Sequence, residues 1–253
     1  MSRYEEHYTV SSHDVDVNGN LRPSLVARFM QETANHHMRN RKPTYYDLFE
    51  EGKSYILTRM VIEIRDEFHM YEDVDSYTWS CDSKAATFIR SYLLERNGRE
   101  AARAYSEWAV ANRNTGKLCL VREIEVSNYE RDIPLDMKIP VKFRFPKTAA
   151  WEETTGKLVE YGEVDMNMHM NNTYYPDMIW NRLPGVESKK MTSLSIRFMA
   201  EAPLGEKIRI FRSKLAEPLD DGCGAEESWY FKSMVKGRTN IEAIISAARC
   251  DTP

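Results

Sequence analysis

The chain has 253 residues, of which 42% are hydrophobic and 29% charged, a composition typical of a folded globular protein and not of a disordered one. Its 35 Lys and Arg against 39 Asp and Glu give a net charge of −4, which is no signature of a protein that binds nucleic acid or anionic lipid. No apolar run approaches the ~18 residues of a membrane helix, and the four cysteines lack metal-binding or redox spacing. We therefore expect a cytoplasmic protein with no metal, cofactor, nucleic acid or membrane partner.

The first half of the chain predicts an entry strand, one helix and then antiparallel strands. The motif Asp16-Val17-Asn18-Gly19-Asn20 precedes residues 24–40, whose apolar side chains recur at helical spacing. Residues 58–64 then alternate apolar and polar side chains, as a half-buried strand does. Further strands are predicted at residues 76–81, 88–93 and 101–111. The helix must bury its apolar side, and a sheet wrapped around it supplies the surface.

The second half repeats this order. The segment Asp165-Met166-Asn167-Met168-His169 echoes the first motif, a helix is predicted over residues 173–182, and the turn at 71–74 aligns with the turn at 203–206. Strands are predicted at residues 192–198, 207–213, 230–235 and 241–249. Such self-similarity indicates a duplicated α+β unit. We expect an N-terminal domain at residues 1–128, a surface linker with three prolines at 129–148 and a C-terminal domain at 149–253.

Residues 163–175 of the second half concentrate side chains that could do chemistry. If the segment is extended, Asp165, Asn167 and His169 project to one side. It leads into the predicted helix, where Asn172 or Thr173 would be the N-cap and unpaired amides would favour a developing negative charge. A carboxylate, an amide, an imidazole and such amides are what acyl transfer to water requires. Taken alone, capping residues and a structural histidine explain the segment equally well.

Other chemically notable side chains are interpreted as structural. Adjacent His36 and His37, near the end of the first predicted helix, are read as cap or surface groups. Trp151, Trp180 and Trp229 either line an apolar channel or fill the core, and the sequence does not separate these two roles.

The stretch from Asp165 to Asn172, followed by Tyr174 or Tyr175, resembles the signature of the acyl-acyl carrier protein (acyl-ACP) thioesterases. These plant and bacterial enzymes release free fatty acids from carrier protein. The first half fits through its opening motif, its long helix and the segment Ala104-Tyr105-Ser106-Glu107-Trp108. The resemblance covers nearly the whole chain. It implies a tandem double hotdog, with two antiparallel sheets each wrapped around a central helix, a non-catalytic first half that forms the acyl pocket, and a catalytic second half.

The resemblance also implies functional residues. The family's Asp, Asn, His and later Glu fall on Asp165, Asn167, His169 and Glu201. Ala202 stands where the plant enzymes have Cys, so a thiolate nucleophile is not expected and hydrolysis must proceed through water or a carboxylate. His169 and Glu201 would share the proton transfers, and backbone amides near Asn171 and Asn172 would polarise the thioester carbonyl. Asp165 would either orient this network or attack directly.

The two halves differ where the chemistry would occur. The position that matches His169 is Asn20, which cannot carry a proton near neutral pH. Glu201 has no clear acidic counterpart, although Asp66 and Glu67 leave this open. We therefore expect one active site per chain, in the second half.

The partner that the resemblance implies is acyl carrier protein bearing a fatty acyl group, and a homodimer is a possible assembly. Because carrier protein is acidic, a basic docking surface is expected. Its candidates are Lys138, Lys142, Arg144, Lys147, Arg182, Lys189 and Lys190, each equally well explained as a solvated charge. An acyl-coenzyme A thioesterase of the same fold is the alternative function. A non-enzymatic acyl-binding protein is a third, against which the retained ionisable residues argue.

Overall fold

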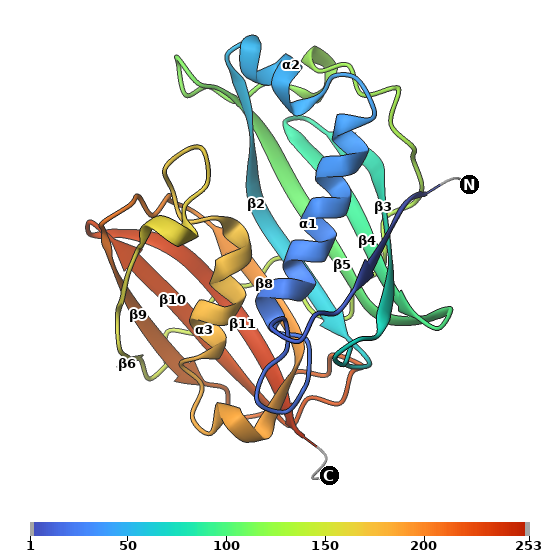
Figure 1. Ribbon diagram of the computed structural model, residues 1–253. Coiled ribbons are helices and arrows are strands. Elements are labelled where there is room, and N and C mark those ends of the chain that lie inside the picture. The colour runs from blue at the N-terminus through green and yellow to red at the C-terminus, as the bar shows by residue number, and fades with distance from the viewer. Residues whose placement is uncertain (1–2, 251–253) are drawn as a thin grey trace.

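The computed structural model describes residues 3–250, which form two similar units (Figure 1). The first unit contains β1 (Tyr4–Thr9), α1 (Pro23–Arg39), α2 (Tyr45–Glu50), β2 (Lys53–Ile64), β3 (Asp73–Lys84), β4 (Thr87–Arg96) and β5 (Arg99–Asn112). The second contains β6 (Glu152–Glu153), β7 (Lys157–Leu158), α3 (Tyr175–Trp180), β8 (Lys189–Phe198), β9 (Lys207–Lys214), β10 (Glu227–Val235) and β11 (Arg238–Arg249). Short 3-10 helices are η1 (Val121–Glu123), η2 (Tyr161–Glu163), η3 (Asn172–Tyr174) and η4 (Val186–Ser188). The predicted α+β order of a helix and then four long antiparallel strands is confirmed in both halves.

The sheets of the two units are joined into one antiparallel sheet. Its strand order is β1-β3-β4-β5-β2-β8-β11-β10-β9-β6, with β7 also paired to β9. The junction is the antiparallel pair β2–β8, in which Met60 lies opposite Ile196 and Ile62 opposite Leu194. The two predicted sheets therefore meet edge to edge, and each unit protects one exposed edge of the other.

The helices cover one face of this sheet (Figure 1). Apolar residues of α1 recur at helical spacing and are buried against the strands, among them Leu25, Val26, Phe29, Met30 and Ala34. The helix of the second half is shorter than the prediction over residues 173–182, because it opens with the 3-10 turn η3 before α3 begins. Both helices contribute to one core that runs through the two units.

The N-terminal ends of the two helices contact each other. The amide of Ser24, in the first turn of α1, donates to one carboxylate oxygen of Asp177 at 2.8 Å, and its hydroxyl donates to the other at 2.5 Å. In the opposite direction, the Arg28 guanidinium of α1 lies over the Tyr174 ring at 5.2 Å. An acidic residue of the second half therefore caps the helix of the first. Burial raises the pKa of Asp177 despite the hydrogen bonds from Ser24.

Residues 129–148 contain no helix or strand. The segment begins beside α1, where Glu130 contacts His37, and residues 138–140 lie on the sheet face opposite to the helices. The buried carboxylate of Glu63 accepts hydrogen bonds from the amides of Lys138 and Ile139, and the hydroxyl of Ser195 donates to the carbonyl of Pro140 at 2.7 Å. Strand β8 is consequently buried on both faces, although the alternation of apolar and polar residues in its sequence predicts one buried face and one exposed face. The linker thus ties the middle of the sheet together.

The turn at residues 71–74 was aligned with the wrong residues of the second half. The amide of Leu21 donates to the carbonyl of Phe68, and the amide of Met170 donates to that of Ala202, both at 2.8 Å. Residues 69–72 therefore correspond to 203–206, a shift of two positions. The left-handed backbone position is Gly205 in one turn and Tyr71 in the other, with φ of 80° and 68°.

Across the described residues 3–250, none of the helices has the length and apolar character needed to cross a membrane.

Candidate active site

The motif at residues 165–169 forms a tight turn and not the extended segment that was predicted. The amide of Asp165 donates to the carbonyl of His169 at 3.0 Å, and the amide of Met168 donates back to the Asp165 carbonyl at 2.9 Å. Inside the turn, the Asp165 carboxylate accepts a hydrogen bond from the Asn167 amide at 2.8 Å. Met168 has a φ of 61°, a left-handed conformation that reverses the direction of the chain. Asp165, Asn167 and His169 therefore do not project to one side as the extended segment predicts.

The motif at residues 16–20 forms the same turn. The amide of Asp16 donates to the carbonyl of Asn20 at 2.8 Å, that of Gly19 donates to the Asp16 carbonyl at 3.1 Å, and the Asp16 carboxylate accepts from the amide of Asn18 at 2.8 Å. The sequence repeat is therefore also a structural repeat, in which Asn20 occupies the place of His169. In both halves the aspartate shapes the turn.

His169 and Glu201 come together across the second half. The chain after β8 pairs with the segment after the turn, through the bridge between His169 and Pro203. This pairing places the imidazole Nε2 of His169 3.2 Å from a carboxylate oxygen of Glu201. The imidazole is 28% exposed and the carboxylate 68% exposed, so both can be reached from solvent. The pair supplies a base or acid and a charged partner in contact.

The first half also has an acidic residue at the position of Glu201. With the turns correctly aligned, this residue is Glu67, which settles the question left open between Asp66 and Glu67. A carboxylate oxygen of Glu67 lies 2.9 Å from the ammonium of Lys190 in β8. The first half therefore keeps the carboxylate, pairs it with a cation and lacks the imidazole.

The N-terminus of the second-half helix follows the turn directly. Asn171, and not Asn172 or Thr173, is the N-cap, because its side-chain oxygen accepts hydrogen bonds from the amide of Thr173 at 3.0 Å and from its hydroxyl at 2.9 Å. The Thr173 amide is thus occupied by the protein. Of the two residues predicted to polarise a carbonyl, Asn171 donates its amide to the carbonyl of Glu163 at 2.9 Å, and Asn172 is the first residue of the capped turn η3.

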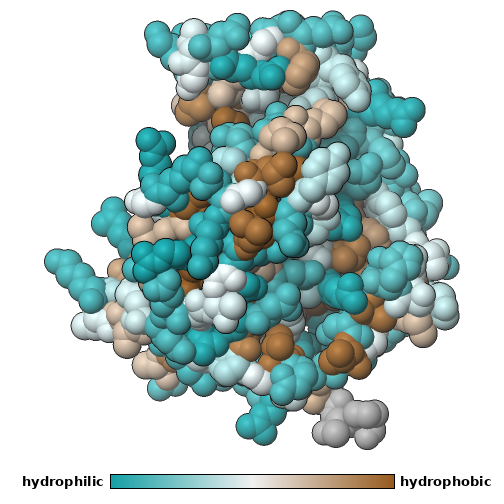
Figure 2. Space-filling model, turned by 60° about the vertical axis from the view of Figure 1, so that its left-hand side comes forward, coloured by the Kyte–Doolittle hydropathy of each residue, from teal (hydrophilic) through white to brown (hydrophobic). Residues whose placement is uncertain are grey.

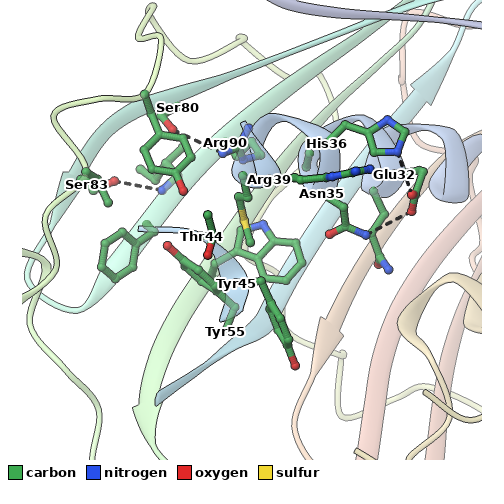
Figure 3. Close-up of a pocket in the computed structure, with 18 of the residues that line it drawn as sticks. Glu32, Asn35, His36, Arg39, Thr44, Tyr45, Tyr55, Ser80, Ser83 and Arg90 are labelled. Carbon is green, nitrogen blue, oxygen red and sulfur yellow. Dashed lines mark hydrogen bonds and ion pairs between the residues drawn. The ribbon is translucent and has the colours of Figure 1, made fainter. Parts of the chain in front are cut away.

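A cavity of about 780 Å³ lies beside this site, mostly within the first unit. Asp165, Asn167, Asn171 and Asn172 line it from the second half, whereas His169 and Glu201 are not among its lining residues. Apolar and aromatic side chains of the first half form much of its wall, including Met38, Tyr45, Tyr55, Phe88, Trp108 and Val126. Figure 3 shows Tyr45 and Tyr55 among the lining side chains. Trp108 was not foreseen as a lining residue, and Trp151, Trp180 and Trp229 do not line this cavity.

One wall of the cavity is charged. Arg90 of β4 lines it and is only 8% exposed. Its guanidinium donates to Nδ1 of His37 at 2.9 Å and to the hydroxyl of Thr78 at 3.1 Å. The burial of Arg90 could have been predicted from the sequence. Arg90 alternates along one strand with Phe88, Tyr92 and Leu94, so it shares their face of the sheet, and all three are buried.

His37 is fully buried, so its interpretation as a cap or surface group was wrong. Its Nε2 donates to the Glu130 carboxylate at 2.5 Å, and its ring stacks on Tyr4. Because Arg90 can only donate, Nδ1 must be unprotonated, which fixes a neutral imidazole. Burial, assisted by the Arg90 charge, lowers the pKa of His37 to about 4. His36 is partly exposed and lies near Glu6 and Glu32, as a surface residue does.

Cysteine chemistry has no support at this site. Ala202, at the position of the plant cysteine, is fully buried. Cys81 lines the cavity, but burial raises its pKa and disfavours the thiolate.

Several of the predicted docking cations are engaged elsewhere. Lys189 pairs with Glu227 at 2.5 Å, Lys190 pairs with Glu67, and Arg182 donates to the carbonyl of Met178 at 2.8 Å. The four predicted docking residues of the linker, Lys138, Lys142, Arg144 and Lys147, are exposed. The face shown in Figure 2 is largely hydrophilic, with apolar groups in small separate patches.

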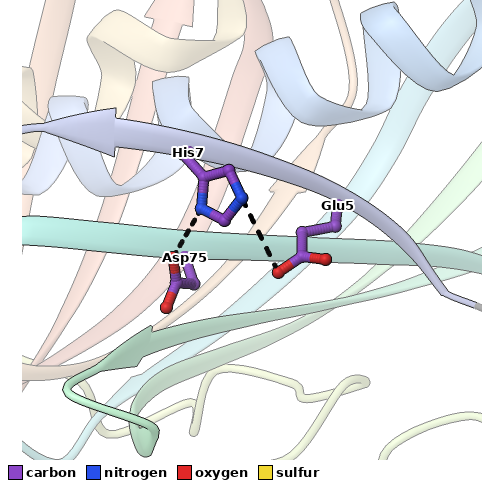
Figure 4. A group of neighbouring side chains, drawn as sticks. All are labelled: Glu5, His7 and Asp75. Atoms are coloured by element: carbon purple, nitrogen blue, oxygen red, sulfur yellow. Dashed lines mark hydrogen bonds and ion pairs between the residues drawn. The ribbon is translucent and has the colours of Figure 1, made fainter.

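A surface cluster of Glu5, His7 and Asp75 combines potential metal ligands from β1 and β3 (Figure 4). Nδ1 of His7 lies 2.6 Å from Asp75, whereas its Nε2 lies 3.9 Å from Glu5. The hydrogen bond to Asp75 raises the pKa of His7, whose side chain is 73% exposed. An ordinary surface pair of histidine and carboxylate accounts for this geometry.

These features define a tandem double-hotdog protein whose second half places a histidine against a glutamate across the turn. Two solved structures share the fold across almost the whole chain. An acyl-ACP thioesterase from Bacteroides thetaiotaomicron has a TM-score of 0.84 and 19% identity, covering 96% of this chain and 97% of that one. The 12:0-ACP thioesterase from Umbellularia californica has a TM-score of 0.83 and 15% identity, covering 98% and 94%.

The chain belongs to the acyl-ACP thioesterase family. The family model for the acyl-ACP thioesterase N-terminal domain matches residues 1–139, and that for the C-terminal domain matches residues 147–247. The chloroplastic acyl-[acyl-carrier-protein] hydrolase FATB2 of Cuphea viscosissima is 21% identical over 93% of this chain and 62% of its own length. The chloroplastic palmitoyl-acyl carrier protein thioesterase of Arabidopsis thaliana is 22% identical over 78% and 52%. The chain thus spans less than two thirds of these relatives.

Proposed function

We propose that this protein hydrolyses the thioester of fatty acyl-ACP and releases the free fatty acid, using Asp165, Asn167, His169 and Glu201 of its second half. The observation that carries the proposal is the contact between His169 and Glu201 beside a turn that borders a large cavity. Membership of the acyl-ACP thioesterase family supports the choice of thioester and carrier.

In the proposed reaction, water attacks the thioester carbonyl and His169 takes a proton from it. Glu201 stabilises the imidazolium that forms. The tetrahedral intermediate then expels the thiolate by breaking the carbon–sulfur bond, and the imidazolium returns the proton to sulfur. Asn172 and Asn167 line the cavity, and the amide of the first or the carboxamide of the second would hold the developing oxyanion or the water.

We propose an orienting role for Asp165 and not direct attack. Its carboxylate accepts the Asn167 amide, and Asp16 makes the same bond in the half that lacks the imidazole. A group that shapes the turn in both halves is explained by structure without a covalent step. A single turnover in heavy-oxygen water, followed by mass analysis of the Asp165 peptide, should show no label in the carboxylate. Label there would instead indicate an anhydride.

The test of the activity is a comparison of thiol release from acyl-ACP and from acyl-coenzyme A of the same chain length. We expect a higher kcat/KM on acyl-ACP, and His169→Ala should abolish release from both. Equal or higher kcat/KM on acyl-coenzyme A would favour the alternative thioesterase. Binding of acyl groups without release from either thioester would favour a non-enzymatic carrier.

Release of the acid would end chain elongation in fatty acid biosynthesis. We propose a cytoplasmic location, which the four cysteines support because none of them forms a disulfide. Carrier protein and a second copy of this chain stay proposed partners. The exposed linker cations Lys138, Lys142, Arg144 and Lys147 are the remaining predicted docking residues, and the linker contacts the sheet face opposite to the helices.

A further inference from the structure

The charged wall of the cavity has donor capacity that the protein does not use. A guanidinium carries five N–H donors. Arg90 gives two of them to His37 and Thr78, and a third to the Ser80 hydroxyl at 3.5 Å (Figure 3). Within residues 3–250, the remaining N–H groups of Arg90 have no hydrogen-bond acceptor. An apolar chain packed against this wall would leave them unpaired.

The immediate partners of Arg90 are neutral. The imidazole of His37 is held unprotonated, and the other two partners are hydroxyl groups. Glu130 does not contact Arg90 directly. Its carboxylate accepts hydrogen bonds from the His37 ring, which lies between the two, and from the Arg41 guanidinium. The positive charge of Arg90 is therefore buried without a carboxylate in direct contact, which is costly unless other acceptors approach it.

A second unused donor lines the same cavity. The Tyr55 hydroxyl has no hydrogen-bond partner within the described part of the chain. Its ring meets Phe88 and Trp108 edge-on, with centroids 6.1 and 6.4 Å away, so packing fixes the side chain. Burial raises the pKa of Tyr55, which keeps the hydroxyl protonated and able to donate.

We infer that the acyl chain accepted by this cavity carries a neutral oxygen substituent, a hydroxyl or keto group, which Arg90 and Tyr55 bind. The inference rests on the proposed function and specifies its substrate class. Arg90 and Tyr55 belong to first-half strands, whereas the reacting carbonyl would lie at the second-half turn, so the oxygen sits along the chain and away from the thioester. Three carboxylates, those of Glu32, Asp82 and Asp165, and three guanidinium groups, those of Arg39, Arg90 and Arg131, line the cavity. Their formal charges balance, so the cavity offers no net positive charge to an anionic chain end.

The test uses acyl-ACP substrates of one chain length: an unsubstituted chain, chains with a hydroxyl or keto group at successive positions, and one with a terminal carboxylate. At one of these positions, wild type should show a kcat/KM about tenfold or more above that of the unsubstituted chain, because a site built to donate hydrogen bonds discriminates against an apolar analogue. No preference at any position, or a preference for the carboxylate alone, would overturn the inference.

Tyr55→Phe is the sharpest variant, because it removes only the unpartnered hydroxyl and keeps the ring contacts. It should reduce the preference for the oxygenated chain about three- to tenfold, the loss of one hydrogen bond. Tyr71→Phe, at an exposed tyrosine that does not line the cavity, is the matched control and should leave the preference unchanged. An unchanged preference in Tyr55→Phe contradicts the inference.

Arg90→Gln should reduce the preference further, and Tyr55→Phe decides the question if the Arg90 variant does not fold. Calorimetric binding of the matched free acids to wild type separates the inference from the proposed activity. Tighter binding of the oxygenated acid would support the inference even if no thioester were cleaved. Equal binding of the acids would contradict it even if cleavage were fast.

Discussion

Asn20 and His169 occupy the same place in two copies of one turn. At the scale of single residues, this exchange of an amide for an imidazole is the main difference between the two halves. Both turns keep an aspartate that accepts the amide two residues later. Both halves also keep a glutamate across from the turn, Glu67 or Glu201. What distinguishes the second half is a side chain that can exchange a proton near neutral pH, with its carboxylate partner 68% exposed and in contact.

His37 gives a prediction for the pH dependence of stability. Its pKa is about 4 in the folded protein and close to its ordinary 6.5 when unfolded. Between these values the unfolded state binds a proton that the folded state does not, so stability falls as the pH drops from 6.5 to 4. The full shift corresponds to a loss on the order of 3 kcal/mol at pH 4.

Replacing the imidazole by a group that does not titrate should remove this dependence. His37→Gln keeps an acceptor for Arg90 and a donor for Glu130, so its melting temperature should fall less steeply than that of wild type between pH 6.5 and 4. The neighbouring His36→Gln is the control and should follow wild type. Parallel curves for wild type and His37→Gln would show that His37 does not set the acid sensitivity.

At the scale of elements, α1 is held by a residue from the other half. Its first turn bonds the carboxylate of Asp177 through the amide and hydroxyl of Ser24, which is 2% exposed. These donors would be buried without partners if the carboxylate were removed. The contact explains how a short second helix can fix the position of a long first one, and through it one wall of the cavity.

Asp177→Ala should therefore lower the free energy of unfolding by about 2–3 kcal/mol, the cost of lost capping and of buried unpaired donors. Asp177→Asn should cost less, because it keeps an acceptor for the Ser24 amide and avoids burying a charge that the protein already disfavours. Urea denaturation of both variants measures the difference. Equal losses, or a loss in Asp177→Ala below about 0.5 kcal/mol, would mean that the cap does not hold the helix.

At the scale of the whole molecule, the sequence repeat predicts the duplicated fold because each copy carries its own helical and strand periodicity. The junction of the two sheets at β2 and β8 was not predictable, since both strands read as ordinary half-buried strands. The extended reading of residues 165–169 failed because Met168 adopts a left-handed conformation without being glycine. Residues His37, Arg90 and Glu130 are far apart in sequence, so only the folded chain shows that they form one buried network.

The central claim is that one half of a duplicated fold is active and the other is silent. The most direct measurement is kcat/KM for acyl-ACP hydrolysis by Asn20→Ala and His169→Ala, which truncate matching side chains of the two turns. We expect Asn20→Ala to stay within about threefold of wild type and His169→Ala to lose at least about a hundredfold, the contribution of a general acid or base. Comparable losses in both variants, or near-normal turnover in His169→Ala, would contradict the account.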